Sequence, residues 1–229
     1  MAVIESPNVV GPEGPLEALL RRPAAGPAAF AALVCHPHPL HGGTMHNKVV
    51  FSIARVLADL GAAVLRFNFR GVGRSAGAWS GGVAERGDVR AALDWLAARY
   101  PGAPLCAGGF SFGAWAAAPV ACADPRVTQL VAVGTPTRLF EPAALEGCRI
   151  RKLFVQGGAD EHGPPAELAA WTDALPGPKT VRVIRGADHV FTGRQGELRA
   201  VLAAYFEAEG PPPAASLTVR DRGPSNSQR

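Results

Sequence analysis

A chain of 229 residues, of which 48% are hydrophobic and 18% charged, is long enough for one sizeable domain with a large core. Its net charge of +4 comes from 23 basic and 19 acidic residues scattered along the chain, which argues against a nucleic-acid-binding stripe. No long apolar run is free of charge and proline, and the first ten residues lack the regions of a signal peptide, so we expect a cytoplasmic protein without a membrane span.

The four cysteines are widely separated along the chain and form no Cys-x-x-Cys pair. Spacing of this kind matches neither a common zinc site nor a redox motif. We therefore expect reduced and mostly buried thiols at Cys35, Cys106, Cys122 and Cys148.

Strand and helix patterns follow one another along the chain. Segments 2–10 and 15–23 have no helical segment between them and predict an antiparallel pair of strands. From residue 30 onward, apolar runs typical of buried strands alternate with segments whose apolar residues recur at helical spacing. The predicted strands are 30–36, 62–69, 103–110, 126–134, 151–158 and 179–186, and the predicted helices are 47–61, 83–102, 112–123, 165–175 and 196–210.

This alternation predicts an α/β fold with a mainly parallel twisted sheet and helices on both of its faces. One domain over residues 1–209 accounts for all of these segments. Residues 210–229 contain three consecutive prolines, few large apolar residues and no periodicity, and they predict a disordered C-terminal tail.

The pentapeptide Gly-Phe-Ser-Phe-Gly at 109–113 lies between a predicted strand and a predicted helix. This is the setting of a nucleophile elbow, a sharp turn that lifts a serine hydroxyl above the sheet. Gly109 and Gly113 would leave room for the neighbouring strand and helix, where any Cβ would clash. The alternative is a glycine-rich turn in which Ser111 only caps the helix.

A serine hydroxyl needs a base, and the base needs an acid that orients it. When such a site is built on an α/β sheet, the order along the chain is serine, acid, histidine. His189 lies before the last predicted helix, where the base is expected. Asp160, at the end of a predicted strand, is the expected acid, and Glu161 is the fallback. Asp188 is a poorer candidate, because it adjoins His189 in the chain and would reach Nδ1 of that ring poorly. We expect Ser111, Asp160 and His189 at the carboxyl edge of the sheet.

These motifs together resemble the small α/β-hydrolases without a cap domain, namely the dienelactone hydrolases and small carboxylesterases. The shared stretches are HPHPLHGGTMHNKVV, FNFRGVGRSAG, GFSFG, QGGADE and GADHVFTGR, and the resemblance covers roughly residues 3–208. It implies a Ser111–Asp160–His189 triad and ester-type hydrolysis. The chain departs from the family at His162 and Gly163, where an apolar pair is more common.

The stretch CHPHPLHGG follows the first predicted parallel strand. In this fold that loop supplies one backbone N–H of the oxyanion hole, and the residue after the nucleophile, here Phe112, supplies the other. Pro37 and Pro39 have no N–H, so His38 is the expected loop donor and Leu40 the second choice.

Two other interpretations of the loops compete with this one. His36, His38, His41 and His46 suggest a metal site, but a metal needs converging rings, and prolines lock a loop that has no acidic residue among these rings. Residues 71–76 fit the dinucleotide fingerprint, yet no helix follows them directly. We instead expect Arg70 to be tied into local hydrogen bonds and Asn47 to anchor the helix that it begins.

A lid domain is not expected, because only 14 residues, TPTRLFEPAALEGC, follow the strand 126–134 before the next strand approaches. The site should therefore be open and bounded by short loops. The candidate substrate-binding walls are the apolar residues Leu40, Met45, Trp79, Phe112, Leu139, Phe140 and Phe191.

We thus predict a serine carboxylesterase that cleaves a small-molecule acyl ester through an acyl-enzyme intermediate. It should need no metal or organic cofactor and bind neither nucleic acid nor membrane, as a monomer or a homodimer. Hydrolysis of an amide, thioester or lactone remains an alternative, because all of these pass through an oxyanion. A non-catalytic interaction module of the same fold and a nucleotide-binding oxidoreductase are alternatives from other classes.

Overall fold

The computed structural model describes residues 3–23, 26–139 and 142–215. Its strands are β1 (Val3–Glu5), β2 (Val9–Gly11), β3 (Gly14–Leu16), β4 (Ala18–Arg22), β5 (Phe30–Cys35), β6 (Ala62–Phe67), β7 (Leu105–Phe110), β8 (Val127–Val133), β9 (Arg151–Gly157) and β10 (Lys179–Ile184). Its α-helices are α1 (Lys48–Asp59), α2 (Arg86–Arg99), α3 (Phe112–Ala123), α4 (Pro165–Asp173) and α5 (Gln195–Glu209), and two 3₁₀ turns are η1 (Pro39–His41) and η2 (Pro142–Leu145).

The main sheet has eight strands in the order β1-β4-β6-β5-β7-β8-β9-β10. The last six strands of this order, which begin with β6 and end with β10, pair in parallel. Strand β4 runs antiparallel to β6, and β1 runs antiparallel to β4. The strands β2 and β3 form a separate antiparallel hairpin. The predicted α/β fold with antiparallel N-terminal strands is confirmed.

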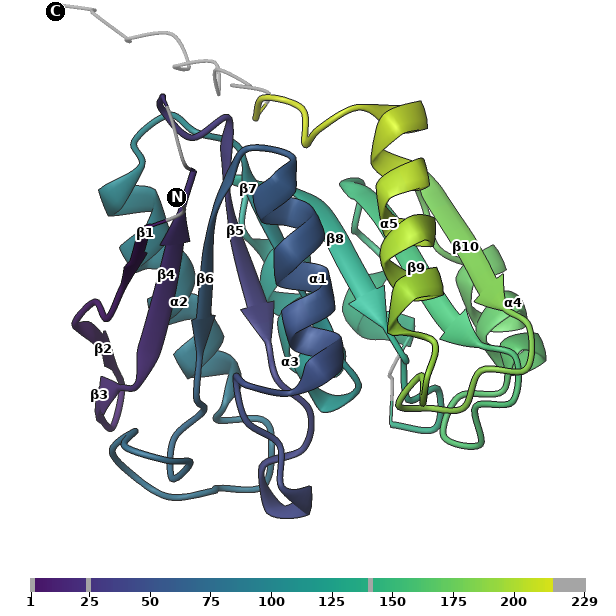
Figure 1. The fold of residues 1–229 in the computed structure, drawn as a ribbon. Coiled ribbons are helices and arrows are strands. Elements are labelled where there is room, and N and C mark those ends of the chain that lie inside the picture. The colour runs from purple at the N-terminus through teal and green to yellow at the C-terminus, as the bar shows by residue number, and fades with distance from the viewer. Residues whose placement is uncertain (1–2, 24–25, 140–141, 216–229) are drawn as a thin grey trace, which may run out of the picture.

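Helices cover both faces of this sheet: α1 and α5 lie on one face, and α2, α3 and α4 on the other (Figure 1). Each face has its own apolar core. Strand β5 serves both, because Leu33 and Cys35 belong to the core under α2 and α3 while Ala32 and Val34 belong to the core under α1 and α5. Since successive side chains of a strand point to opposite faces, a strand covered on both sides needs an unbroken apolar run.

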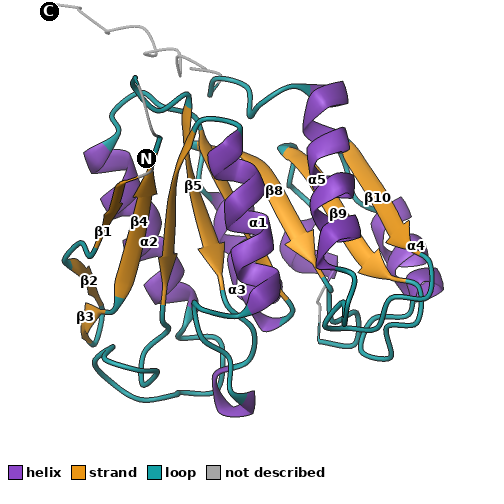
Figure 2. Cartoon of the chain, in the orientation of Figure 1, coloured by secondary structure: helices purple, strands orange, loops and turns teal. Residues whose placement is uncertain are grey.

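The parallel strands all end at the same edge of the sheet, and the loops that leave this edge are drawn teal at the bottom of Figure 2. The link between β8 and β9 contributes η2 and carries no inserted domain in its described residues. In the described residues, only loops and the short turn η2 therefore cover this part of the carboxyl edge.

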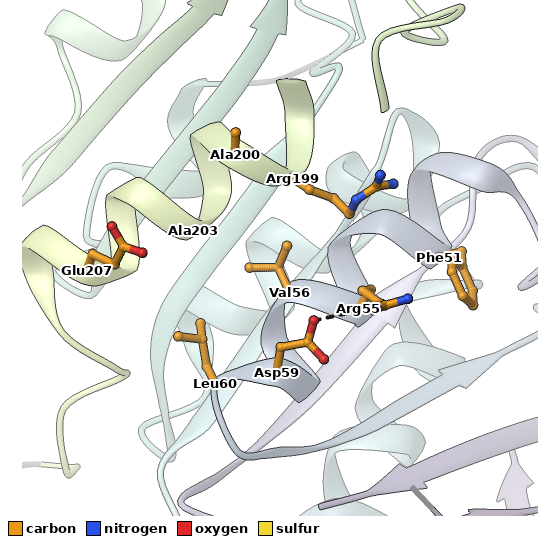
Figure 3. A pocket seen from close by; sticks show the side chains of 9 residues that line it. All are labelled: Phe51, Arg55, Val56, Asp59, Leu60, Arg199, Ala200, Ala203 and Glu207. Atoms are coloured by element: carbon orange, nitrogen blue, oxygen red, sulfur yellow. Dashed lines mark hydrogen bonds and ion pairs between the residues drawn. The ribbon is translucent and has the colours of Figure 1, made fainter. Parts of the chain in front are cut away.

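The helices α1 and α5 pack against each other on their face of the sheet. A hollow of about 580 Å³ lies between them, with Arg55 and Asp59 paired at its border (Figure 3). Its described lining residues belong to these two helices, except Leu60, which follows α1. The hollow therefore lies on the helical face and not among the loops of the carboxyl edge.

The cysteine prediction is wrong for one pair, because Cys122 and Cys148 form a disulfide. Cys122 lies near the end of α3 and Cys148 follows η2, which packs against α3. Cys35 and Cys106 are free and buried in the sheet, and burial raises the pKa of both thiols. The fold, and not any sequence motif, brings the bonded pair together.

The first residues after α5 are fixed by Arg151. Its guanidinium donates hydrogen bonds to the carbonyl oxygens of Glu209, Gly210 and Pro211. The disordered tail was predicted to begin at residue 210, so two of these contacts are made by its first two residues. Its part over 216–229 lies outside the described residues.

The disulfide gives a test of the fold in solution. Denatured but unreduced protein should show two titratable thiols with Ellman's reagent, and four after reduction, because only Cys35 and Cys106 are free. Reduction should lower the free energy of unfolding by about 3 kcal/mol, since the bond closes a loop of 26 residues in the unfolded chain. The control is the double variant Cys122→Ser/Cys148→Ser, whose stability should not respond to reductant. Four thiols in the unreduced protein would contradict the bond.

Candidate active site

Ser111 lies at the junction of β7 and α3 in a backbone conformation that side chains rarely adopt, with φ 54° and ψ −120°. The turn is tight because a Cβ on Gly109 would lie 2.6 Å from the carbonyl carbon of Gly113 and 2.8 Å from the carbonyl oxygen of Cys35. The Ser111 side chain makes no capping hydrogen bond to α3. The helix-cap alternative is therefore wrong, and the hydroxyl is free for another partner.

That partner is His189, whose Nε2 lies 2.9 Å from Ser111 Oγ. On the other side of the ring, Nδ1 lies 2.8 Å from Oδ2 of Asp160 and 3.0 Å from Oδ1. An ionised carboxylate can only accept, so Nδ1 carries the proton and Nε2 is left to accept from the serine hydroxyl. Ser111, His189 and Asp160, which were predicted from separate loops, thus form one hydrogen-bonded chain.

Asp160 is only 3% exposed and receives donors from its own loop and strand. Its Oδ1 accepts from the backbone N–H groups of His162, at 2.9 Å, and Gly163, at 3.2 Å, and its Oδ2 accepts from Nε2 of Gln156 at 2.7 Å. These bonds hold the carboxylate in place and compensate its burial. Sequence reasoning did not find Gln156, which reads as an ordinary polar residue at the end of a strand.

The two other candidate acids do not reach the histidine ring. Asp188 Oδ1 accepts from the backbone N–H of Thr192 at 2.7 Å, and Glu161 has a side chain that is 85% exposed. The structure therefore places only Asp160 against His189 Nδ1.

His38 lies on the loop after β5, and its N–H and that of Phe112 donate to no acceptor in the described part of the chain. Both residues line the cleft around Ser111. The N–H of the second-choice donor, Leu40, is already engaged, because it donates to Nδ1 of His38 at 3.2 Å. Burial lowers the pKa of His38, which agrees with a ring nitrogen that accepts. The candidate oxyanion donors are therefore His38 and Phe112.

His36 is fully buried at the base of the same loop. One ring nitrogen, Nδ1, lies 2.7 Å from the carbonyl oxygen of Pro37, and Nε2 accepts from the N–H of Phe69 at 3.0 Å. The ring thus ties the end of β5 to the segment after β6. Burial lowers its pKa to about 4, so it is neutral near pH 7.

The histidine-rich loop does not form a metal cluster in the described residues, which contain no group of three His, Cys, Asp or Glu side chains that could hold an ion. The ring of His38 instead stacks on that of His41, with centroids 4.5 Å apart. Asn47 begins α1 as predicted, and its Oδ1 accepts from the N–H groups of Val49 and Val50.

The glycine-rich segment 71–76 does not open a helix, because α2 begins only at Arg86. Arg70 is instead paired with the buried carboxylate of Asp88 through its backbone N–H, Nε and Nη2. The structure thus removes the geometric basis of the dinucleotide-binding hypothesis and confirms that Arg70 is tied into local hydrogen bonds.

The loops enclose a cleft of about 310 Å³ around Ser111 and His189. It is lined by Pro37, His38, His41, Gly42, Gly43, Asn47, Phe110, Ser111, Phe112, Pro136, Leu139, His162, His189 and Val190. His162 was not predicted to be a wall, yet its ring lies against that of His189, with centroids 4.5 Å apart and planes at 69°. The departure at this position therefore places an imidazole in the cleft.

Most of the predicted apolar walls lie elsewhere. Met45 and Phe191 are buried in the protein, at 1% and 0% exposure, and Leu40 projects into solvent away from the cleft lining. Trp79 is absent from the lining but packs against two residues that form it, with its ring centroid 4.6 Å from that of His38 and 5.3 Å from that of Phe112. Phe140 lies outside the described residues. Of the predicted walls, Phe112 and Leu139 do line the cleft.

Comparisons with known proteins agree with this fold. The family model of Serine aminopeptidase, S33, matches residues 38–146. A structure of an alpha-beta serine hydrolase homologue from Coxiella burnetii is 39% identical, with a TM-score of 0.82, over 88% of this chain and 96% of that one. A serine hydrolase without lid from Xanthomonas campestris is 33% identical, with a TM-score of 0.82, over 90% and 94% of the two chains.

A curated protein also matches over most of its length. An uncharacterized protein of Rickettsia prowazekii is 36% identical over 205 residues, which are 86% of each chain. In the described part of this chain, no helix is long and apolar enough to cross a membrane.

The lowered pKa of His36 leads us to expect that the folded protein loses stability in mild acid. The unfolded state binds a proton near the ordinary pKa of 6.5, whereas the folded state resists protonation down to about 4. The contribution of His36 to the free energy of unfolding is therefore full above pH 6.5 and falls by about 3 kcal/mol toward pH 4. Urea unfolding of the wild type and His36→Gln should show the stability gap between them shrinking over this range. A gap that stays constant with pH would contradict the buried neutral ring.

The close packing around Gly163 leaves no room for a side chain at this position of the loop that carries Asp160. A Cβ there would overlap the carbonyl oxygen of Thr135 and lie 2.5 Å from Nε2 of Gln156. Gly163→Ala should therefore displace the donors of Asp160, lower stability by about 2 kcal/mol and reduce hydrolysis more than tenfold. The matched control is Gly147→Ala, whose Cβ would meet nothing within 4 Å. Equal stability and turnover in the two variants would contradict this role.

Proposed function

Because the chain belongs to the family of α/β serine hydrolases without a lid, we propose that it is a carboxylesterase with Ser111, His189 and Asp160 as its catalytic triad. The observation that carries this proposal is the hydrogen-bonded chain from Ser111 Oγ to His189 Nε2, at 2.9 Å, and from His189 Nδ1 to Asp160 Oδ2, at 2.8 Å. It is the arrangement that activates a serine hydroxyl.

The first half of the reaction forms an acyl-enzyme. Ser111 Oγ attacks the carbonyl carbon of the ester while His189 Nε2 takes the hydroxyl proton. The carbonyl oxygen becomes an oxyanion and accepts hydrogen bonds from the N–H groups of His38 and Phe112. Asp160 stabilises the imidazolium. The tetrahedral intermediate then collapses, the bond from the carbonyl carbon to the alkoxy oxygen breaks, and Nε2 gives its proton to the departing alcohol.

The second half repeats these steps with water. His189 Nε2 takes a proton from a water molecule, whose oxygen attacks the acyl carbon. A second tetrahedral intermediate uses the same two N–H donors and collapses by breaking the bond to Ser111 Oγ. That oxygen recovers its proton from His189, and the carboxylic acid leaves. An open cleft lets water reach the acyl-enzyme without the movement of a lid.

An aminopeptidase activity is the second candidate, since the matched family model is of serine aminopeptidases. An aminopeptidase must bind the free ammonium group of its substrate, and a buried or cleft-lining carboxylate is the side chain suited to that task. The lining residues that the structure describes include no Asp or Glu. Asp160 lies beneath the cleft and is engaged by His189. The lining therefore favours an ester over a peptide with a free amino terminus.

Ser111→Ala tests the proposal directly. Removal of the nucleophile should lower kcat for a small p-nitrophenyl ester by about 10³-fold or more and abolish labelling by a fluorophosphonate probe. Ser6→Ala, which replaces an exposed serine outside the cleft, is the matched control and should keep both properties. Turnover at the wild-type rate in Ser111→Ala would refute the mechanism, and a wild type without labelling or turnover would favour a non-catalytic interaction module.

A further inference from the structure

The cleft around Ser111 adjoins a second hollow of about 570 Å³. Gly42, Asn47 and Val190 line both spaces, so the second begins where the first ends. Its other side is formed by Thr44, His46, Lys48, Thr192 and Gln195, which come from the start of α1 and the approach to α5. We call this space the Lys48 hollow.

The Lys48 hollow and the active-site cleft share an unusual charge pattern. Among the described residues, no Asp or Glu lines either space, and Lys48 is the one lining residue with a formal charge. Five of the six histidines also line these spaces: His38, His41, His162 and His189 in the cleft and His46 in the hollow. Among the described lining residues, the ammonium of Lys48 is therefore the one permanent charge, and it is positive.

The Lys48 ammonium is available to a ligand. Its side chain is exposed and makes no hydrogen bond or ion pair with any residue in the described part of the chain. The charged groups nearest along the chain to Thr192 have their own partners: Asp188 accepts from the Thr192 N–H, and Arg194 pairs with Glu197. The Asp188 carboxylate therefore lies near the hollow through the Thr192 backbone, but it is not among the described residues that line it and does not pair with Lys48.

We propose that the Lys48 hollow binds the carboxylate of an ester substrate whose scissile carbonyl lies at Ser111. The proposal rests on the esterase function above and names its substrate class: half-esters of dicarboxylic acids, with the free carboxylate on the acyl side. The ammonium of Lys48 supplies the charge, and the hydroxyl of Thr44 and the amide of Gln195 supply further donors. The first N–H groups of α1 are not the source of this preference, because Asn47 Oδ1 already accepts from Val49 and Val50.

The measurement is a ratio of kcat/KM values for matched ester pairs. Monoethyl succinate, glutarate and adipate carry the charge, and ethyl butanoate, pentanoate and hexanoate have the same acyl length without it. The wild type should prefer the charged member of at least one pair. Lys48→Gln should lower that ratio about fivefold, the upper end for an exposed ion pair. Lys48→Glu should lower it further, because it places a like charge beside the carboxylate.

Salt and a distant charge provide the controls. In 0.5 M NaCl, the ratio should fall in the wild type but not in Lys48→Gln, since salt screens an exposed contact. Arg182 lies on β10 and lines neither space. The variant Arg182→Gln removes one positive charge there and should keep the wild-type ratio. A fall in Arg182→Gln equal to that in Lys48→Gln would show a long-range field and overturn the site.

A second series places the charge on the alcohol side: 4-acetoxybutanoate against butyl acetate. A dependence on Lys48 in this series alone would overturn the acyl-side assignment. A ratio that Lys48→Gln leaves unchanged in every pair would overturn the binding site as a whole while leaving the esterase intact. Absence of any Ser111-dependent ester hydrolysis would instead overturn the proposed function, so the two failures are distinguishable.

Discussion

Three backbone segments meet at Ser111 more closely than side chains would allow, and the arrangement of the site depends on this contact. A Cβ on Gly113 would overlap the carbonyl groups of Cys35 and His36, and one on Gly109 would strike Gly113. Cys35 lies opposite Gly109 in the parallel pairing of β5 with β7. The same packing therefore places the serine and begins the loop that carries His38. The proposed nucleophile and a proposed oxyanion donor, which are far apart in the chain, become neighbours through sheet register alone.

Two buried, neutral side chains hold the loops on either side of this contact. His36 joins the end of β5 to the N–H of Phe69, beyond β6. Gln156, on β9, accepts from the N–H of Thr135 after β8 and donates to Asp160. Each bridges the ends of two adjacent strands without a formal charge. Uncharged bridges suit this place, because a buried charge without a partner costs far more than a buried hydrogen-bonded amide or imidazole. The charge that the site does bury, on Asp160, has several donors.

Periodicity and motif order were enough to predict the sheet, its helices and the loops that carry Ser111, Asp160 and His189, because these follow from local patterns and the shared edge of parallel strands. Side-chain direction in loops was not predictable. Phe191 adopts a φ of 53° and turns into the core, and Met45 is buried where its N–H donates to Asn68. The bond between Cys122 and Cys148 follows from the packing of η2 on α3, which no spacing of cysteines reveals.

The histidine-rich loop shows how one residue type serves different ends within a few positions. His36 is a buried bridge, the His38 ring accepts from the Leu40 N–H, and His46 faces the Lys48 hollow. Because the nitrogens of the first ring and Nδ1 of the second are already engaged within the protein, these rings cannot converge on an ion without breaking those bonds. The loop is therefore built around its backbone, and its rings set the surroundings of the cleft. With no lid over the described part of the cleft, selectivity must come from such wall contacts, and the described lining supplies imidazole, amide and apolar groups to them.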